Sequence, residues 1–227
     1  MNENLRRITR VAEQLGPICE RVVFLGGAST TLLITDPTAH NIRPTKDVDT
    51  IIEITSRTEY YSLEADLRKF GFRDDREVIG RWHINDEIVD IMPTDERILG
   101  FSNKWYSPAI THANEYRLPN GLIIRVIAPA YFMATKLEAF YGRGHGDYMG
   151  SKDIEDIIMV VDGRPSLVEE VRNSSQALQS YCEEQFQILL GDERFLESIA
   201  GHLIPDSASQ SRRPIIIDRL KAIANQD

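Results

Sequence analysis

The sequence predicts an α+β fold: a small mixed sheet with helices, followed by an all-α part. Two observations carry this prediction. Short β-branched strand patterns alternate with amphipathic helical patterns up to about residue 128, and every periodic stretch from residue 129 to residue 227 is helical. The 227 residues suffice for one domain of ordinary size with a smaller helical partner. We therefore expect one domain over 1–128 and a helical C-terminal domain over 129–227.

Hydrophobic spacing defines the elements of the first half. Apolar residues at helical spacing predict a helix over 3–20. The turn-rich stretch 35–46, with two prolines, predicts a loop, and Asn120-Gly121 between apolar runs predicts a hairpin turn. The other elements expected here are strands at 21–25, 47–54, 81–84, 87–92, 110–118 and 122–127, and helices at about 29–34 and 59–70.

The second half is predicted to be helices joined by turns. Pro129 is favoured at the first position of a helix, because the N–H that proline lacks is not needed there, and it predicts a helix to about Tyr141. The glycine-rich stretch 142–150 ends that helix. Further helices are expected at about 151–161, 166–190, 192–203 and 214–225.

Composition excludes several classes of protein. With 42% hydrophobic and 27% charged residues, the chain is typical of a soluble globular protein. A net charge of -9 argues against a protein that coats nucleic acid, which needs a basic surface. The N-terminus lacks an apolar signal-peptide core and no run approaches the ~18 apolar residues of a spanning helix, so we expect a cytoplasmic protein without membrane contact. The two distant cysteines and the spacing of the histidines predict neither a disulfide nor a zinc site.

A glycine turn follows the first expected strand. Gly26 and Gly27 allow the backbone to approach a ligand, and the amides at a helix N-terminus attract phosphate. Ser29 adds a hydroxyl to that position. The same pattern equally describes a glycine turn with Ser29 as a helix N-cap. Neither a P-loop GK[ST] nor a GxGxxG spacing is present.

Two carboxylates flank Val48 in a strand-like stretch. Because strand side chains alternate, Asp47 and Asp49 point to one face of the sheet, where they repel each other unless a cation lies between them. Carboxylate oxygens are the ligands that Mg²⁺ prefers. The alternative is a strand edge with two solvated acids.

A third acid lies in an apolar stretch. Asp90 sits within Glu-Ile-Val-Asp-Ile-Met, and an acid in a buried strand is costly unless it is paired or bound to metal. It would complete the carboxylate set of a two-metal phosphoryl-transfer site, and it can accept a proton from an attacking hydroxyl. The alternative is an acid at a frayed strand end. We therefore expect Mg²⁺ at Asp47, Asp49 and Asp90.

Four other polar residues are candidates for binding. Lys136 shares a helical face with two phenylalanines, and it either extends its amine to solvent, pairs with an acid or reaches a triphosphate. Asp153 lies in the first turn of the next expected helix, where an acid is often only a capping choice. Arg43 and Thr45, in the loop before the first acidic strand, either contact phosphate or brace the loop.

Together these motifs resemble the nucleotidyltransferase superfamily of the DNA polymerase beta type. Their order, continued by the later lysine and acid, is similar to that of AbiE/MenT-type nucleotidyltransferase toxins of bacterial toxin–antitoxin and abortive-infection systems. The resemblance covers about 20–160 and makes 1–128 the nucleotidyltransferase core. It implies that Gly27 and Ser29 hold the triphosphate, Asp47 and Asp49 the metals, that Lys136 meets the nucleotide, and that Asp153 completes the site.

The resemblance implies a Mg²⁺-dependent enzyme that moves a nucleoside monophosphate from a nucleoside triphosphate to an acceptor hydroxyl. Some family members modify the acceptor end of tRNA, which makes tRNA the expected acceptor and a cognate antitoxin an expected partner. Arg43, Arg143 and Lys152 are then expected to contact acceptor phosphates.

Two alternative functions stay open. One is transfer to a small molecule, as in aminoglycoside-modifying relatives, or to a protein hydroxyl. The other is a nucleotide-binding partner protein that has lost the chemistry, against which the intact Asp47, Asp49 and Lys136 argue.

Overall fold

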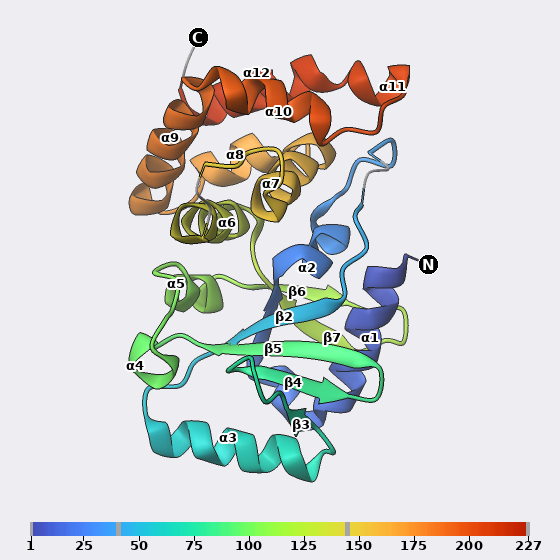
Figure 1. The fold of residues 1–227 in the computed structure, drawn as a ribbon, viewed down its shortest axis with the longest axis vertical. Coiled ribbons are helices and arrows are strands. Elements are labelled where there is room, and N and C mark those ends of the chain that lie inside the picture. Colours follow the sequence, from blue (N-terminus) through green and yellow to red (C-terminus); the bar gives the residue numbers. More distant parts are fainter. Residues whose placement is uncertain (1, 40–41, 144–145, 226–227) are drawn as a thin grey trace. The chain divides into compact units, whose positions relative to one another are not determined.

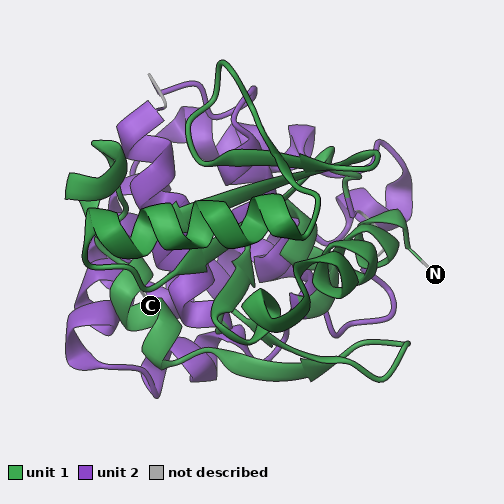
Figure 2. Cartoon of the chain, turned by 90° about the horizontal axis from the view of Figure 1, so that it is seen from below, with its two compact units in different colours: residues 1–32, 43–128 green, residues 33–42, 129–227 purple. Residues whose placement is uncertain are grey.

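The computed structural model describes residues 2–39, 42–143 and 146–225. It confirms the α+β fold, with a seven-stranded mixed sheet before residue 128 and helices after it. The chain divides into two compact units, coloured separately in Figure 2: residues 1–32 with 43–128 (unit 1) and residues 33–42 with 129–227 (unit 2). No helix in the described ranges is long and apolar enough to cross a membrane.

Unit 1 is built around its sheet, whose strand order is β3-β4-β5-β2-β1-β7-β6 (Figure 1). The central strand β2 (Asp47–Ile52) runs parallel to β5 (Glu87–Pro93) and antiparallel to β1 (Val22–Leu25). β1 also runs parallel to β7, and the other neighbouring strands are antiparallel. The remaining strands are β3 (Arg73–Asp74), β4 (Arg81–Ile84), β6 (Asn114–Arg117) and β7 (Ile123–Val126).

One face of the central strands is apolar and forms the core of unit 1. Val48, Trp82 and Val89 are at most 2% exposed, and helix α1 (Glu3–Leu15) contacts β2 and β5. Arg7 and Arg10 of α1 both pair with Glu87 at the start of β5: Arg7 Nη1 lies 2.5 Å from Oε2, and Arg10 Nε lies 2.6 Å from Oε1. Because successive side chains of a strand point to opposite faces of the sheet, the polar residues next to Val48, Trp82 and Val89 in the sequence lie on the other face.

The helices of unit 1 correct several expectations. The helix expected over 3–20 is α1 followed by the 3₁₀ segment η1 (Gly16–Glu20), because Gly16 and Pro17 interrupt the α pattern. Helix α2 (Gly26–Leu33) begins at the first glycine, so Ser29 lies inside it and does not cap it. The strand expected to begin at Ile110 is wrong at its start, because that residue belongs to α5. The other helices are α3 (Arg57–Lys69), α4 (Glu96–Leu99) and α5 (Tyr106–Thr111).

The regular secondary structure in the described part of unit 2 is helical. Its core contains the fully buried rings of Phe132, Phe186 and Phe195. The single helix expected over 166–190 is wrong: the chain turns before Ser175, whose hydroxyl accepts from the Leu178 amide and starts a new helix. The helices are α6 (Pro129–Arg143), α7 (Lys152–Gly163), α8 (Leu167–Arg172), α9 (Gln176–Leu190), α10 (Glu193–Gly201), α11 (Ser207–Gln210) and α12 (Arg213–Ile223).

The segment 33–42 lies within unit 2 although its neighbours in sequence belong to unit 1. The amides of Thr35 and Asp36 both donate to the Gly163 carbonyl at 2.9 Å. Arg212 then bridges two acids, with Nη2 2.7 Å from Asp36 Oδ2 and Nε 2.6 Å from Asp162 Oδ1. Hydrogen bonds from Thr38 and Arg212 hold the pKa of Asp36 well below its usual range.

Candidate active site

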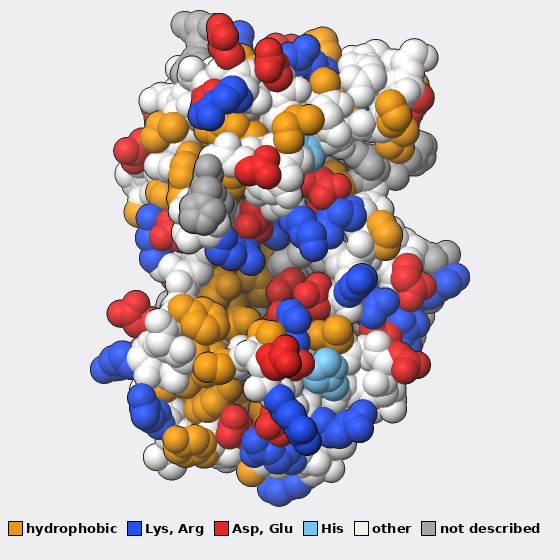
Figure 3. Space-filling model, viewed as in Figure 1, with side chains coloured by type: hydrophobic (Ala, Val, Ile, Leu, Met, Phe, Trp, Pro, Cys, Tyr) orange, Lys and Arg blue, Asp and Glu red, His pale blue; other side chains and the backbone are white. Residues whose placement is uncertain are grey.

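Asp47, Asp49 and Asp90 lie on one face of the sheet of unit 1. In the parallel pair of β2 and β5, Asp49 is registered opposite Asp90, and Asp47 lies two residues before Asp49. Registered residues of neighbouring strands point to the same face, so the three carboxylates are neighbours. The Asp47 side chain is 37% exposed and that of Asp90 is 8% exposed. Figure 3 shows acidic and basic side chains next to one another on this part of unit 1.

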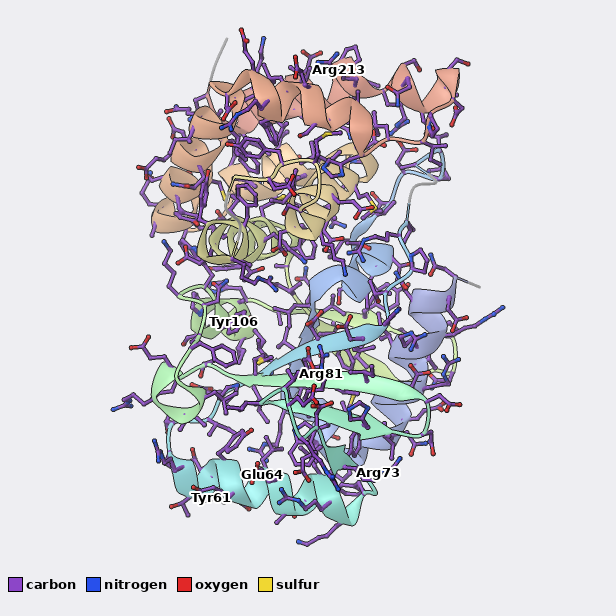
Figure 4. The ribbon with its side chains drawn as sticks, viewed as in Figure 1. Tyr61, Glu64, Arg73, Arg81, Tyr106 and Arg213 are labelled. Atoms are coloured by element: carbon purple, nitrogen blue, oxygen red, sulfur yellow. The ribbon has the colours of Figure 1, made fainter. Side chains whose placement is uncertain are left out.

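Arg81 is the residue of this face that the sequence reasoning missed. On β4 it is registered opposite Asp90, and its guanidinium binds that carboxylate through two bonds, Nε to Oδ1 at 2.7 Å and Nη2 to Oδ2 at 2.8 Å. Nη2 also lies 3.3 Å from Asp47 Oδ2. The bond to Asp90 raises the pKa of Arg81. Figure 4 labels Arg81 over β5 with side-chain oxygens close by.

The position of Arg81 bears on the expected metal ligands. No group of three or more His, Cys, Asp or Glu side chains in the described part of the chain is arranged to hold a metal. Asp47 and Asp49 nevertheless fit a hard divalent cation by their donor chemistry, since both present carboxylate oxygens on the same face. The metal set Asp47, Asp49 and Asp90 therefore stays a prediction, with Arg81 now placed against two of its members.

Gly26 makes room for Asp49. A Cβ on Gly26 would lie 2.5 Å from Asp49 Cγ and 2.7 Å from its Cβ, with Oδ2 closer still. Gly26 also has a φ of 72°, which favours glycine. The turn from β1 into α2 thus brings the backbone directly against the carboxylate, and any side chain at residue 26 would displace it.

The other residues expected to hold the triphosphate are engaged inside unit 1. Ser29 is fully buried and its hydroxyl donates to the Leu25 carbonyl at 2.8 Å. Gly27 lies in the first turn of α2, and its carbonyl accepts from the Thr30 hydroxyl. The role of Gly27 in binding phosphate stays a prediction.

The loop before β2 is braced by α1. Asn4 Nδ2 donates to the Arg43 carbonyl at 2.9 Å, and the Thr45 amide donates to Asn4 Oδ1 at 3.0 Å. The Thr45 hydroxyl in turn donates to the Asp47 carbonyl at 3.0 Å. These bonds favour the bracing role for Thr45. They also hold the backbone at Asp47, the first of the acids and the first residue of β2.

In unit 2, Lys136 and Asp153 meet in a cluster of charges. Lys136 Nζ lies 3.1 Å from Asp153 Oδ1 and 2.6 Å from Asp156 Oδ2. Arg143 binds the other oxygen of Asp153 at 3.0 Å. Of the three roles considered for Lys136, pairing with an acid is the one that these distances support within unit 2. Sequence reasoning missed Asp156, although its spacing of three from Asp153 on one helix was a signal that both share a face.

The likeness to known proteins is clearest at the level of fold. No protein-family model matches the sequence, and no curated protein matches it. The solved structure of an antigenic nucleotidyltransferase-like protein from Paracoccidioides brasiliensis is similar with a TM-score of 0.53 and 22% identity, over 86% of this chain and 93% of that chain. The chain has a nucleotidyltransferase-like fold.

Two further solved structures are more distant. JHP933 from Helicobacter pylori has a TM-score of 0.48 and 9% identity, over 99% of this chain and 94% of that chain. The antibiotic-resistance factor ANT(2'')-Ia has a TM-score of 0.47 and 16% identity, over 82% of this chain and 95% of that chain. Both scores lie below that of the Paracoccidioides brasiliensis protein, whose likeness to this chain is one of fold.

Proposed function

We propose that the protein is a Mg²⁺-dependent nucleotidyltransferase that moves a nucleoside monophosphate from a nucleoside triphosphate to an acceptor hydroxyl. The observation that carries the proposal is the pair Asp47 and Asp49 on one sheet face, with the Gly26 backbone against the second carboxylate. Two carboxylates on one face suit a hard cation. The nucleotidyltransferase-like fold gives that arrangement its chemical context.

The proposed reaction is an in-line displacement at the α phosphorus. An acceptor oxygen forms a bond to that phosphorus while the bond to the β-phosphate oxygen breaks, and pyrophosphate leaves. The hydroxyl proton passes to a carboxylate of the site or to water. A bound Mg²⁺ would neutralise charge that develops on the phosphate oxygens, and the role of Asp47 and Asp49 is to hold and orient it.

For the acceptor, we propose the 3′ end of tRNA, and for the biological role, the toxin of a toxin–antitoxin pair. The support is the order of motifs shared with AbiE/MenT-type toxins. Because the chain carries a net charge of -9, few phosphate contacts are available, so RNA binding should be weak with a shallow dependence on salt.

A second acceptor class has its own support. The same net charge of -9 favours a cationic small molecule, such as an aminoglycoside, over a polyanion. Transfer to a small molecule is therefore the alternative that the experiment must separate from transfer to RNA.

The test is a labelling assay with each α-³²P nucleoside triphosphate, Mg²⁺ and total tRNA. We expect label on tRNA-sized RNA, and none after periodate oxidation of the 3′ terminal diol. Asp49→Asn should lower labelling at least about 100-fold while the protein melts normally, because a cation ligand is lost. Asp74→Asn, an exposed acid on β3 of the same unit, is the matched control and should label normally.

The outcomes assign the acceptor. Label on an aminoglycoside or a protein with RNA untouched would replace the tRNA proposal with the alternative. Labelling by Asp49→Asn within a few-fold of the unsubstituted protein would contradict the metal role of Asp49. Absence of transfer to every acceptor would favour a nucleotide-binding protein without the chemistry.

A further inference from the structure

One nitrogen atom stands where a bridging cation would stand. Arg81 Nη2 lies 2.8 Å from an oxygen of Asp90 and 3.3 Å from an oxygen of Asp47. A divalent cation shared by these carboxylates would contact the same two residues, at about 2.0–2.1 Å for Mg²⁺. The guanidinium and a cation bridging Asp47 and Asp90 therefore exclude each other.

The two contacts of Arg81 differ in strength. The pair with Asp90 is bidentate, directly cross-strand and between side chains that are 26% and 8% exposed, which is the stronger kind of charge-assisted contact. The contact with Asp47 is single, longer and reaches a side chain that is 37% exposed. A guanidinium does not lose its proton in proteins, so Arg81 cannot yield its place by deprotonation. We expect the Asp47 contact to break first.

We propose that Arg81 is the resident cation of this face and keeps Asp90 out of the metal site, so that a divalent cation binds through Asp47 and Asp49. This inference rests on the proposed function, because it assigns the ligands of the same site. Both Asp90 oxygens accept hydrogen bonds from Arg81. Arg81 is thus a positioning residue that acts on the cation through the two acids it contacts.

The inference predicts that removing the charge of Arg81 tightens divalent-cation binding. Arg81→Gln removes a positive charge from beside Asp47 and releases Asp90, so the affinity for Mn²⁺ should rise about tenfold or more. Arg81→Lys keeps a positive charge near both acids and should stay within about threefold of the unsubstituted protein. Asp90→Asn added to Arg81→Gln should abolish the gain, because it removes the released carboxylate and returns the net charge of this face to that of the unsubstituted protein.

The measurement is Mn²⁺ binding by electron paramagnetic resonance, which counts free Mn²⁺ and needs neither nucleotide nor turnover. Thermal melting of each variant verifies folding. Arg81→Met, a neutral side chain of similar length, supplies the same comparison if Arg81→Gln fails to fold.

The results separate the two proposals. Tighter binding by Arg81→Gln, lost again with Asp90→Asn, supports the role of Arg81. Equal or weaker binding by the neutral variants overturns it, as does a gain that survives Asp90→Asn. If Mn²⁺ binds in the expected pattern but no acceptor is ever labelled, the proposed function fails while the role of Arg81 stands.

Discussion

Replacing Gly26 by alanine tests whether the turn between β1 and α2 exists to admit the Asp49 carboxylate. The added Cβ would lie 2.5 Å from Asp49 Cγ, which is shorter than van der Waals contact allows. The alanine at residue 26 would also have to adopt a φ of 72°. The left-handed conformation costs an alanine roughly 1–2 kcal/mol. Forcing a methyl group into occupied space adds typically about 1–3 kcal/mol. We therefore expect Gly26→Ala to lower the free energy of unfolding by about 2–5 kcal/mol.

A matched glycine separates strain from collision. Gly121 has a φ of 89° and nothing within 4 Å of the Cβ position, so Gly121→Ala carries the conformational cost alone. Urea denaturation of both variants gives the collision energy as the difference. The functional consequence is measured as Mn²⁺ affinity. This affinity should fall in Gly26→Ala, because Asp49 is displaced, and stay unchanged in Gly121→Ala.

Two results would refute the reasoning about Gly26. One is a Gly26→Ala variant no less stable than Gly121→Ala, and the other is a Gly26→Ala variant with unchanged Mn²⁺ affinity. A double variant sharpens the test: Asp49→Ala removes the two nearest atoms of the three that meet the new Cβ. Its cost should therefore be less than additive with that of Gly26→Ala.

Two further predictions concern charges outside this turn. Lys136→Met should lower the free energy of unfolding by about 3–5 kcal/mol, because the buried Asp156 side chain, 1% exposed, loses its cation. In the same urea titration Lys69→Met, at an exposed ion pair, should lower it by no more than about 1 kcal/mol. Equal losses in the two variants would contradict the buried pairing. The bond from His83 holds the pKa of Asp75 at about 2, below its ordinary 3.8. Its contribution to stability is therefore complete above pH 4 and lost as the pH falls through 2, so the gap between the unsubstituted protein and Asp75→Asn should close over that range; a constant gap would refute it.

Much of the sheet and its acidic face could be predicted from the sequence, because strands have a period of two. That period alone places Asp47 and Asp49 together. The cost of burying an acid indicates that Asp90 needs a partner or a metal, and the register of β2 with β5 places it opposite Asp49. The role of Asp47 and Asp49 as metal ligands stays a prediction.

Arg81 was within reach of the same reasoning. The two-residue turn Asn85-Asp86 pairs Ile84 with Glu87, and counting outward from that pair places Arg81 opposite Asp90. Asn85 makes the turn with a φ of 51°, a conformation that asparagine tolerates better than most residues. The register of a hairpin thus carried the pairing, and only the pairwise comparison of the two strands was needed to find it.

Other features could not be predicted from local pattern. The short helices α4 and α5 lack a full amphipathic repeat, being 4 and 6 residues long. The placement of segment 33–42 within unit 2 depends on Arg212 and Gly163, which are far away in sequence. Local propensity contains no information about such distant partners.

The anchoring of segment 33–42 has a consequence for the order in which the chain can fold during synthesis. Asp36 is fixed by a residue 176 positions later in the chain, and the amides beside it are fixed by the end of α7. While a ribosome is still making the helices of unit 2, the strands on both sides of this segment already exist and can pair. The segment between them cannot form its hydrogen bonds to Gly163 and Arg212 until α7 and Arg212 have emerged from the ribosome.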